Sequence, residues 1–201
     1  MPLNLIITGV GGQGNVLASQ ILGRTAVQKG LKVTIGETFG LSQRGGPVMS
    51  HIRFSKDRNY GPLIPPNMAH IIVGLEPLEV LRILVEYGND KTVILVNSRP
   101  IYPLNVTAGE VEYPDPEKIR QILKKSADRV FWLDATKVAV DSGGPFMLNM
   151  IILGALSKVP GFPLAINDIE GVLSDFFSES VLEANFRALS IGGGLIQDNE
   201  N

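Results

Sequence analysis

Six residues near the N-terminus, Gly9-Val10-Gly11-Gly12-Gln13-Gly14, have the types and spacing of a loop that binds phosphate. Gly9, Gly11 and Gly14 fit the pattern G-x-G-x-x-G, in which small residues let the backbone turn sharply out of a strand. Without side chains in the way, the backbone N–H groups of such a loop reach ligand oxygens at the start of a helix. We therefore expect a cofactor contact through Gly9, Gly11, Gly12, Gln13 and Gly14. The alternative is a turn that only packs the helix against the strand.

A second candidate segment, from Gly36 to Pro47, places hydrogen-bonding side chains between glycines. We expect it at the carboxyl edge of a sheet, where open α/β sheets bind their ligands. The guanidinium of Arg44 is suited to a phosphate or a carboxylate because it donates two parallel hydrogen bonds. A solvated surface turn is the alternative. The cofactor-binding residues that we expect in this segment are Ser42, Gln43, Arg44, Gly45 and Gly46.

Glu37 lies just after the second expected strand, where a dinucleotide-binding enzyme places the acid that binds a ribose. This position favours an NAD-like ligand, and an exposed loop glutamate is the alternative. His51 and His70 have no carboxylate or nucleophile at motif spacing, so we interpret both as structural.

Two further polar residues stand near expected helices. Asp134 ends a strand at the expected ligand edge, but we favour its interpretation as a helix or turn cap. Asn149 interrupts an otherwise apolar helix face. If it is buried, its amide needs a hydrogen-bond partner, so we expect an interface residue or a loop anchor there.

Motifs for catalysis and for metal binding are missing from the sequence. It has no G-x-S-x-G elbow, no Walker lysine after the glycine loop, no H-E-x-x-H and no Gly-Asp-Gly thiamine diphosphate signature. The chain has no cysteine, which excludes disulfides, thiolate zinc sites and iron–sulfur clusters held by its own thiolates. We therefore expect neither a catalytic residue nor a metal site in this chain.

Short apolar runs alternate with amphipathic patterns, and this alternation predicts an α/β fold. The first strand, helix and second strand form a βαβ unit, which predicts a sheet that is parallel at its start with a right-handed crossover. Residues 48–54 alternate in polarity, with His51 on the polar side, and fit an antiparallel strand with one wet face. The expected strands cover residues 3–8, 32–35, 48–54, 71–74, 92–97 and 130–134, and the expected helices 15–29, 77–86, 116–125 and 147–158.

The last part of the chain is expected to be helical. Asn167 with Glu170, and Ser180 with Glu183, have the spacing of capping boxes, which predicts that each pair starts a short helix. The glycines at 192–194 and the polar residues at 197–201 are typical of a loose chain end.

Composition limits the possible partners and compartment. With 201 residues, of which 44% are hydrophobic, we expect residues 1–201 to form a single domain with a substantial core. The net charge of −2 gives no electrostatic footprint for nucleic acid or for an anionic membrane. Glycines interrupt the first apolar stretch, and the run at 146–156 is too short to cross a bilayer. We expect a soluble, cytoplasmic protein without nucleic-acid or membrane partners.

Together these residues resemble the gamma subunit, or gamma domain, of the 2-oxoacid:ferredoxin oxidoreductases. This family includes enzymes of the pyruvate, ketoisovalerate and 2-oxoglutarate type and the short subunit of indolepyruvate ferredoxin oxidoreductase. The resemblance covers nearly the whole chain. One departure is Gly143-Gly144-Pro145, where a Gly-Asn-Pro-like turn is expected. The matching segments are 9–14 and 42–53, and more loosely 134–136, Asn149 and 153–155.

The resemblance implies a Rossmann-like α/β fold: a mostly parallel twisted sheet with helices on both faces and a helical C-terminal portion. It implies a subunit of an enzyme that oxidatively decarboxylates a 2-oxoacid with coenzyme A, giving acyl-CoA, carbon dioxide and reduced ferredoxin. Thiamine diphosphate and iron–sulfur clusters would belong to partner subunits, and ferredoxin would be reached through the complex. This chain would be a scaffold and a wall that faces coenzyme A. The sequence does not identify the 2-oxoacid.

Two alternatives from other functional classes remain open. A self-sufficient NAD-dependent dehydrogenase is suggested by the glycine pattern and Glu37, although no acid or base for hydride transfer is identifiable. The other is a pure interaction module whose glycine loop docks against a partner's backbone.

Overall fold

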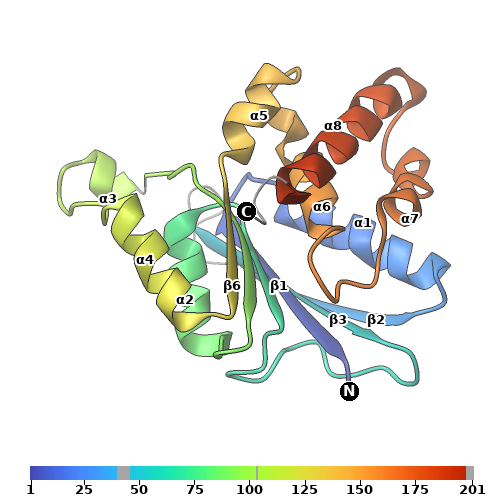
Figure 1. The fold of residues 1–201 in the computed structure, drawn as a ribbon, viewed down its shortest axis with the longest axis horizontal. Helices are drawn as coiled ribbons and strands as arrows, with labels where there is room; N and C mark the ends of the chain where they lie inside the picture. The colour runs from blue at the N-terminus through green and yellow to red at the C-terminus, as the bar shows by residue number, and fades with distance from the viewer. Residues whose placement is uncertain (40–45, 103, 198–201) are drawn as a thin grey trace.

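A six-stranded sheet in the order β2-β3-β1-β4-β5-β6 forms the centre of the protein (Figure 1). The computed structural model describes residues 1–39, 46–102 and 104–197. The strands are β1 (Leu3–Val10), β2 (Lys32–Phe39), β3 (Pro47–Ser55), β4 (Ile71–Gly74), β5 (Val93–Asn97) and β6 (Arg129–Leu133). The helices are α1 (Asn15–Gln28), α2 (Pro77–Tyr87), α3 (Leu104–Thr107), α4 (Pro116–Ser126), α5 (Ala135–Asp141), α6 (Leu148–Leu156), α7 (Ile166–Glu170) and α8 (Glu179–Gln197), with the 3-10 turns η1 (Pro145–Met147) and η2 (Leu173–Asp175).

The first half of the sheet differs from the expected parallel start. β1, β4, β5 and β6 are parallel neighbours, but β3 lies between β1 and β2 and pairs antiparallel with both. His51 of β3 is thus opposite Ile6 on one side and Gly36 on the other. The prediction of an antiparallel strand at 48–54 is confirmed. β1 and β2 do run in the same direction, as a βαβ crossover requires, but they are not hydrogen-bonded neighbours.

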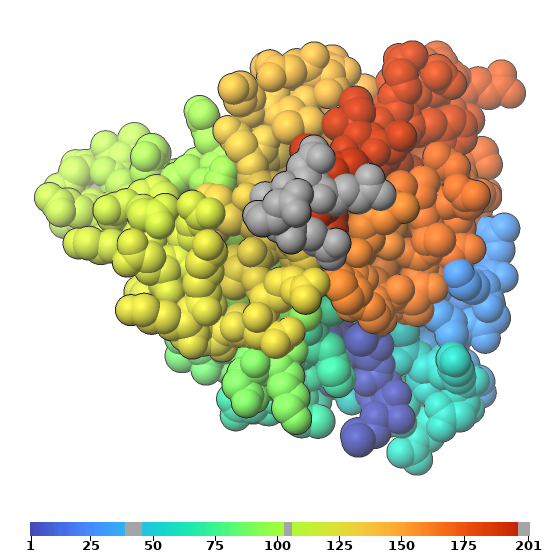
Figure 2. Space-filling model, viewed as in Figure 1, coloured from blue at the N-terminus to red at the C-terminus, as the bar shows by residue number. Residues whose placement is uncertain are grey.

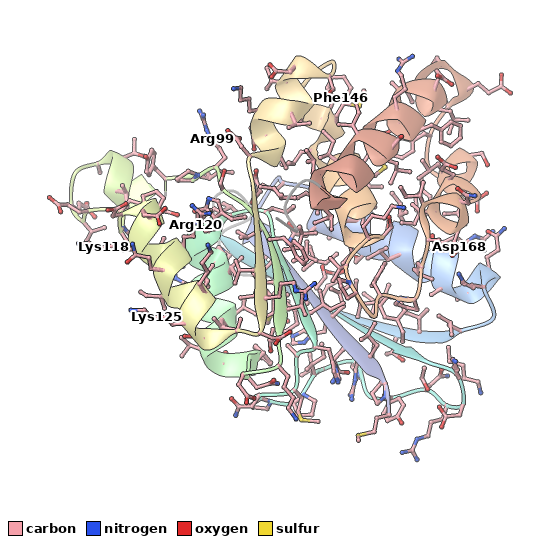
Figure 3. The ribbon with its side chains drawn as sticks, viewed as in Figure 1. Arg99, Lys118, Arg120, Lys125, Phe146 and Asp168 are labelled. Atoms are coloured by element: carbon pink, nitrogen blue, oxygen red, sulfur yellow. The ribbon has the colours of Figure 1, made fainter. Side chains whose placement is uncertain are left out.

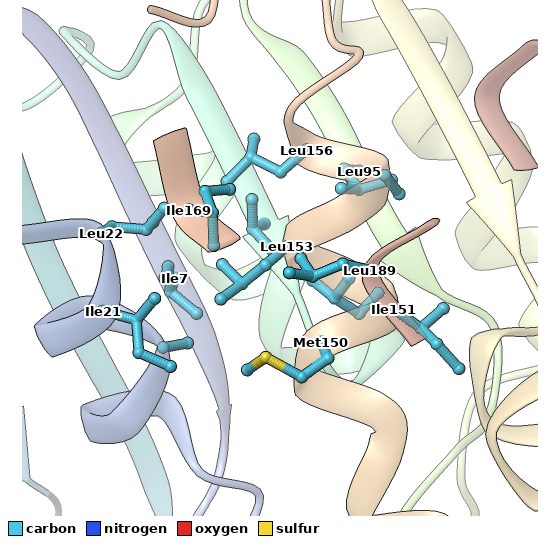
Figure 4. Close-up of a cluster of buried hydrophobic side chains, with 14 of the residues drawn as sticks. Ile7, Ile21, Leu22, Leu95, Met150, Ile151, Leu153, Leu156, Ile169 and Leu189 are labelled. Atoms are coloured by element: carbon cyan, nitrogen blue, oxygen red, sulfur yellow. The ribbon is translucent and has the colours of Figure 1, made fainter. Parts of the chain in front are cut away.

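Hydrophobic cores lie on both faces of the sheet because side chains alternate along each strand. Leu5 and Ile7 of β1 point to one face, where α1, α6, α7 and α8 cover them (Figure 4). Ile6 points to the other face, toward α2 and α4. Figure 1 shows these two layers on either side of the sheet, and in the space-filling view α4 lies on the left and the α6–α8 region on the right (Figure 2). The predicted mostly parallel sheet with helices on both faces is confirmed.

The starts of the helices follow their capping residues. Asp115 accepts a hydrogen bond from the Glu117 N–H (2.9 Å) and begins α4 at Pro116, as predicted. α7 instead begins at Ile166, where the Asp168 carboxylate accepts from the Ala165 N–H (2.7 Å), so the box predicted from Asn167 is wrong. The box predicted at Ser180 is also wrong, because α8 already begins at Glu179 and continues for 19 residues.

The glycines at 192–194 lie inside α8, and the predicted loose end is therefore wrong for them. Their role is close packing against α6. A Cβ on Gly192 would stand 2.0 Å from the Ile151 carbonyl oxygen, and one on Gly154 of α6 would stand 2.0 Å from the Leu189 carbonyl oxygen. The two helices approach so closely that each contributes a glycine against the other's backbone.

Because α6 and α8 pack so closely, we expect glycine-to-alanine substitutions at two nearby positions of α8 to change the free energy of unfolding in opposite directions. Gly192→Ala should lower the free energy of unfolding by about 2 kcal/mol or more, because the helices must separate to admit the methyl group. Gly194→Ala is the matched control: its Cβ meets nothing within 4 Å, so the better helix propensity should stabilise the protein by about 0.5–1 kcal/mol. Urea unfolding of the two variants measures both effects, and equal stabilities would contradict the close packing.

Candidate functional site

A cleft of about 730 Å³ opens at the carboxyl edge of the parallel strands. Its walls come from the glycine loop, the segment after β5, the starts of α5 and α6, and α8. Arg99 and Phe146 lie on the side of the molecule where α5 stands (Figure 3). The lining residues are Gly12, Gln13, Gly14, Leu17, Asn97, Arg99, Pro100, Ile101, Thr136, Pro145, Phe146, Leu148, Asn149, Phe177, Val181 and Asn185.

The glycine loop connects β1 to α1 as its sequence pattern predicts. Gly12 and Gly14 have φ angles of +100° and +84°, which favour glycine. Gly12 is exposed at the cleft, and a Cβ there would meet nothing within 4 Å. Gly14 caps α1 without a side-chain hydrogen bond to the first turn. Among the described residues, no side chain therefore caps the N-terminus of α1, and a helix N-terminus of this kind favours negative charge.

The side chain of Gln13 holds the loop to the sheet. Its Oε1 accepts from the Val10 N–H (2.7 Å), and its Nε2 donates to the Leu75 carbonyl beyond β4 (2.9 Å). A Cβ on Gly9 would stand 2.6 Å from Oε1, so Gly9 makes room for the amide. Both polar ends of Gln13 are therefore bonded within the fold.

Asn97 extends this network to the next strands. Its Nδ2 donates to the same Leu75 carbonyl (3.1 Å) and to Thr136 Oγ1 (2.9 Å), while its Oδ1 accepts from the Thr136 N–H (3.1 Å). We call the chain of bonds from Gln13 through Leu75 and Asn97 to Thr136 the amide network. It joins the carboxyl ends of β1, β4, β5 and β6, which form the floor of the cleft.

The other predicted cofactor residues are found in different places. Gly46 is buried beside the glycine loop, and its carbonyl accepts from the Gly11 N–H (2.9 Å). Glu37 is half-buried in β2, where its carboxylate accepts from Ser19 Oγ (2.6 Å) and Ser50 Oγ (2.5 Å). It does not line the cleft. Ser42, Gln43, Arg44 and Gly45 lie outside the described residues.

The polar residues predicted near helices lie at the starts of α5 and α6. Asp134 caps α5 by accepting from the Lys137 N–H (3.1 Å). Asn149 lies on α6 against the loop, so close that a Cβ on Gly14 would stand 2.2 Å from its Nδ2. Asn149 therefore packs against the glycine loop, and it also lines the cleft, so its role as a loop anchor or an interface residue stays a prediction. Its buried Oδ1 accepts no hydrogen bond from any residue that the structure describes.

Both histidines are structural, as predicted, although His51 is buried rather than on a wet face. The loop that follows β3 covers it, and its Nδ1 accepts from the Ile64 N–H (3.3 Å). Nδ1 of His70 accepts from the Asn4 N–H (3.0 Å). Loss of solvation lowers the pKa of each imidazole below its ordinary value.

Arg99 is the charged residue of the cleft that sequence reasoning missed. Within the described ranges it is the one charged residue in the lining, and none of the described side chains pairs with it. Asn97 ends the buried strand β5 and Arg99 is the second residue after it, which is a signal similar to the one that pointed to Asp134. Most of the other lining side chains are apolar, and Phe146 among them is 70% exposed. The cleft therefore suits a ligand that has an anionic group and an apolar part.

No group of three histidine or acidic side chains is arranged to hold a metal ion within residues 1–39, 46–102 and 104–197. In the same ranges, no helix combines the length and apolar character needed to cross a membrane.

The chain is similar to proteins of known name along almost its whole length. The family model for pyruvate ferredoxin/flavodoxin oxidoreductase matches residues 4–194. The indolepyruvate oxidoreductase subunit IorB of Pyrococcus horikoshii is 36% identical over 190 residues, which cover 94% of this chain and 93% of that protein. The common gamma subunit of the pyruvate/ketoisovalerate oxidoreductases of Pyrococcus furiosus is 30% identical over 187 residues, which cover 90% of this chain and 89% of that protein.

A solved structure has the same fold. The 2-oxoglutarate:ferredoxin oxidoreductase of Magnetococcus marinus, determined with 2-oxoglutarate, coenzyme A and succinyl-CoA bound, matches with a TM-score of 0.72 and 20% identity. The match covers 98% of this chain but only 31% of that longer chain. The resemblance inferred from the glycine loop and the segment at 42–53 is confirmed: the chain belongs to the pyruvate ferredoxin/flavodoxin oxidoreductase family.

Proposed function

We propose that this chain works as the gamma-type subunit of a multi-subunit 2-oxoacid:ferredoxin oxidoreductase, with residues 1–201 acting as one domain. Family membership supports this proposal, together with relatives that are named as subunits rather than as complete enzymes. The reaction is the oxidative decarboxylation of a 2-oxoacid with coenzyme A to acyl-CoA, carbon dioxide and reduced ferredoxin. The chain acts in the assembled complex, where it shapes one side of the ligand site and contributes to ligand binding.

Coenzyme A is the ligand that we propose for the cleft. It has an anionic diphosphate and a long pantetheine arm, whose methyl and methylene groups suit the apolar part of the lining. The observation that carries the proposal is that Arg99 and the N-terminus of α1 at Gly12–Gly14 line the same cleft as a set of apolar side chains. Arg99 and the loop N–H groups would hold the phosphates, while the wall at Ile101 and Phe146 would contact the arm.

Thiamine diphosphate and the iron–sulfur clusters belong, in this proposal, to partner subunits. The absence of cysteine leaves this chain no thiolate to ligate a cluster. Thiamine diphosphate bound in a partner would supply the carbanion-stabilising chemistry that decarboxylation needs, and iron–sulfur clusters would supply electron transfer. The contribution of this chain is to orient the thiol carrier and to exclude water from its side of the site.

The alternatives are less well supported. A self-sufficient NAD-dependent dehydrogenase is not favoured by the family match, and the carboxylate of Glu37 already accepts from two serines away from the cleft. An interaction module that docks through its glycine loop predicts that a bulky residue at Gly11 abolishes assembly while ligand affinity persists. Our proposal predicts that ligand affinity is lost.

Purification tests the proposed complex. The chain isolated from its native host should come with partner polypeptides that carry thiamine diphosphate and iron–sulfur clusters, because turnover needs both groups. Metal and thiamine analysis of the native complex measures them, with activity followed as 2-oxoacid-dependent reduction of ferredoxin. Turnover by this chain alone, or a native complex without thiamine and clusters, would overturn the proposal.

The assigned role of Arg99 predicts a specific kinetic defect. In the assembled complex, Arg99→Ala should raise the KM for coenzyme A about tenfold and leave the KM for the 2-oxoacid unchanged, because one charged contact is lost. The difference in this KM between the variant and the wild type should become smaller at high salt, because Arg99 is exposed and salt screens its charge. Arg187→Ala is the control: Arg187 is an exposed residue of α8 that pairs with Glu183. An unchanged KM for coenzyme A would contradict the proposed ligand site.

A second prediction concerns Gln13, whose amide supports the loop rather than the ligand. Gln13→Leu should lower the free energy of unfolding by about 1–3 kcal/mol, because the Val10 N–H loses its acceptor. Gln20→Leu makes the same change on the exposed face of α1 and should change stability by no more than about 0.5 kcal/mol. Denaturant titration of the two proteins gives the comparison. Similar values for both would show that the loop does not depend on this amide.

A further inference from the structure

Arg99 belongs to a long segment whose placement needs an explanation. The segment leaves the end of β5 at Asn97 and reaches α4 only at Asp115. Its first residues form one wall of the cleft, and the Ser98 N–H is fixed to the Leu133 carbonyl (2.7 Å). Beyond this bond the chain turns outward, so that Ile101 and Tyr102 are 38% and 59% exposed. An exposed loop of this kind must contact the rest of the fold if Arg99 is to stay at a fixed distance from the glycine loop.

Tyr113 makes such a contact from the far end of the segment. Its hydroxyl donates to Oε1 of Glu76, a residue that is 1% exposed. The other oxygen of Glu76 accepts from the Glu79 N–H (2.9 Å) and so caps α2. Burial raises the pKa of Tyr113 well above its ordinary value, and the bond to Glu76 raises it further. The hydroxyl is thus a neutral, permanent donor to a fixed carboxylate.

The ring of Tyr113 connects this anchor to the cleft wall. It meets the ring of Tyr102 edge-on, with centroids 5.2 Å apart and an interplanar angle of 84°. Tyr102 directly follows Ile101, which lines the cleft two residues after Arg99. A continuous path therefore runs from Glu76 through both tyrosine rings to the wall.

The residues just after β4 also hold the glycine loop, which forms the wall of the cleft opposite Arg99. Glu76 directly follows Leu75, whose carbonyl accepts from Gln13 of the glycine loop. One dipeptide at the end of β4 therefore anchors both the loop and, through the tyrosines, the Arg99 segment. The separation between the two anion-binding elements is set there.

We propose that Tyr113 is a positioning residue for ligand binding: through Glu76 on one side and Tyr102 on the other, it fixes the Arg99 wall opposite the glycine loop. We call the Glu76–Tyr113–Tyr102 contact the tyrosine clamp. This inference rests on the proposed function, because it assumes that the cleft takes coenzyme A. It assigns a binding role to a residue that lines no part of the cleft.

The test uses Tyr113→Phe, which keeps the ring and removes the hydroxyl. In the assembled complex, the KM for coenzyme A should rise about fivefold, and amide hydrogen exchange at residues 98–102 should be at least fivefold faster. Tyr102→Ala, on the exposed side of the clamp, should give the same two changes without touching buried Glu76. Tyr60→Phe is the matched control: it removes a hydroxyl from a ring that lies under Arg53 and Arg58 outside the clamp, and it should behave as the wild type.

A double-mutant cycle separates positioning from general destabilisation. If Tyr113 acts through Arg99, then Tyr113→Phe should change the KM for coenzyme A less than twofold in an Arg99→Ala background. If the increases in the KM for coenzyme A caused by the two single substitutions multiply in full in the double variant, the clamp is overturned. It is also overturned if amide hydrogen exchange at residues 98–102 keeps its wild-type rate in both Tyr113→Phe and Tyr102→Ala. Failure of the proposed function looks different: Arg99→Ala alone would then leave the KM for coenzyme A unchanged, and the exchange rates would still decide whether the clamp exists.

Discussion

The carbonyl oxygen of Leu75 is the point on which the architecture of the cleft depends. It lies just beyond β4 and accepts hydrogen bonds from Gln13 and from Asn97, one from each side. A parallel sheet leaves the carbonyls at its carboxyl edge without partners from the strands themselves, and buried carbonyls need donors. Two amide side chains meet that need here. By doing so, they fix the glycine loop and the end of β5 relative to each other.

Much of the fold was predictable because local signals agree with the global structure. Ile71–Gly74 was predicted with its observed bounds because a short apolar run fits a strand buried on both faces. The prolines at 77 and 116 mark the starts of α2 and α4 because proline suits the first helical turn. The position of β3 between β1 and β2 was not predictable. Strand order depends on pairing between segments far apart in the sequence, and the local hydrophobic periodicity does not record it. The same holds for α8, whose glycines resemble a loose end until α6 packs against them.

The candidate site was predictable in part, for a related reason. The spacing of Gly9, Gly11 and Gly14 identified the loop because that geometry is local. Arg99 was missed because it becomes the charge of the cleft only when the end of β5 lies near the end of β1, with β4 between them. Glu37 shows the opposite case: its position in the sequence matches a ribose acid, but two serine hydroxyls from α1 and β3 take up its carboxylate. Residue type and spacing identify candidates, and only tertiary contacts decide which of them face a ligand.

The insertion of β3 between β1 and β2 also links the loop to the stability of a distant element. β2 and β3 are consecutive antiparallel strands, and in the part of the chain that the structure describes the pairing of β3 with β1 joins both to the rest of the sheet. Gly46, at the start of β3, supplies the acceptor for the Gly11 N–H. Local opening of this pair would therefore leave that donor without its backbone partner at the mouth of the cleft. A molecule that has lost β2 and β3 would therefore no longer hold the glycine loop in the geometry that we propose for anion binding.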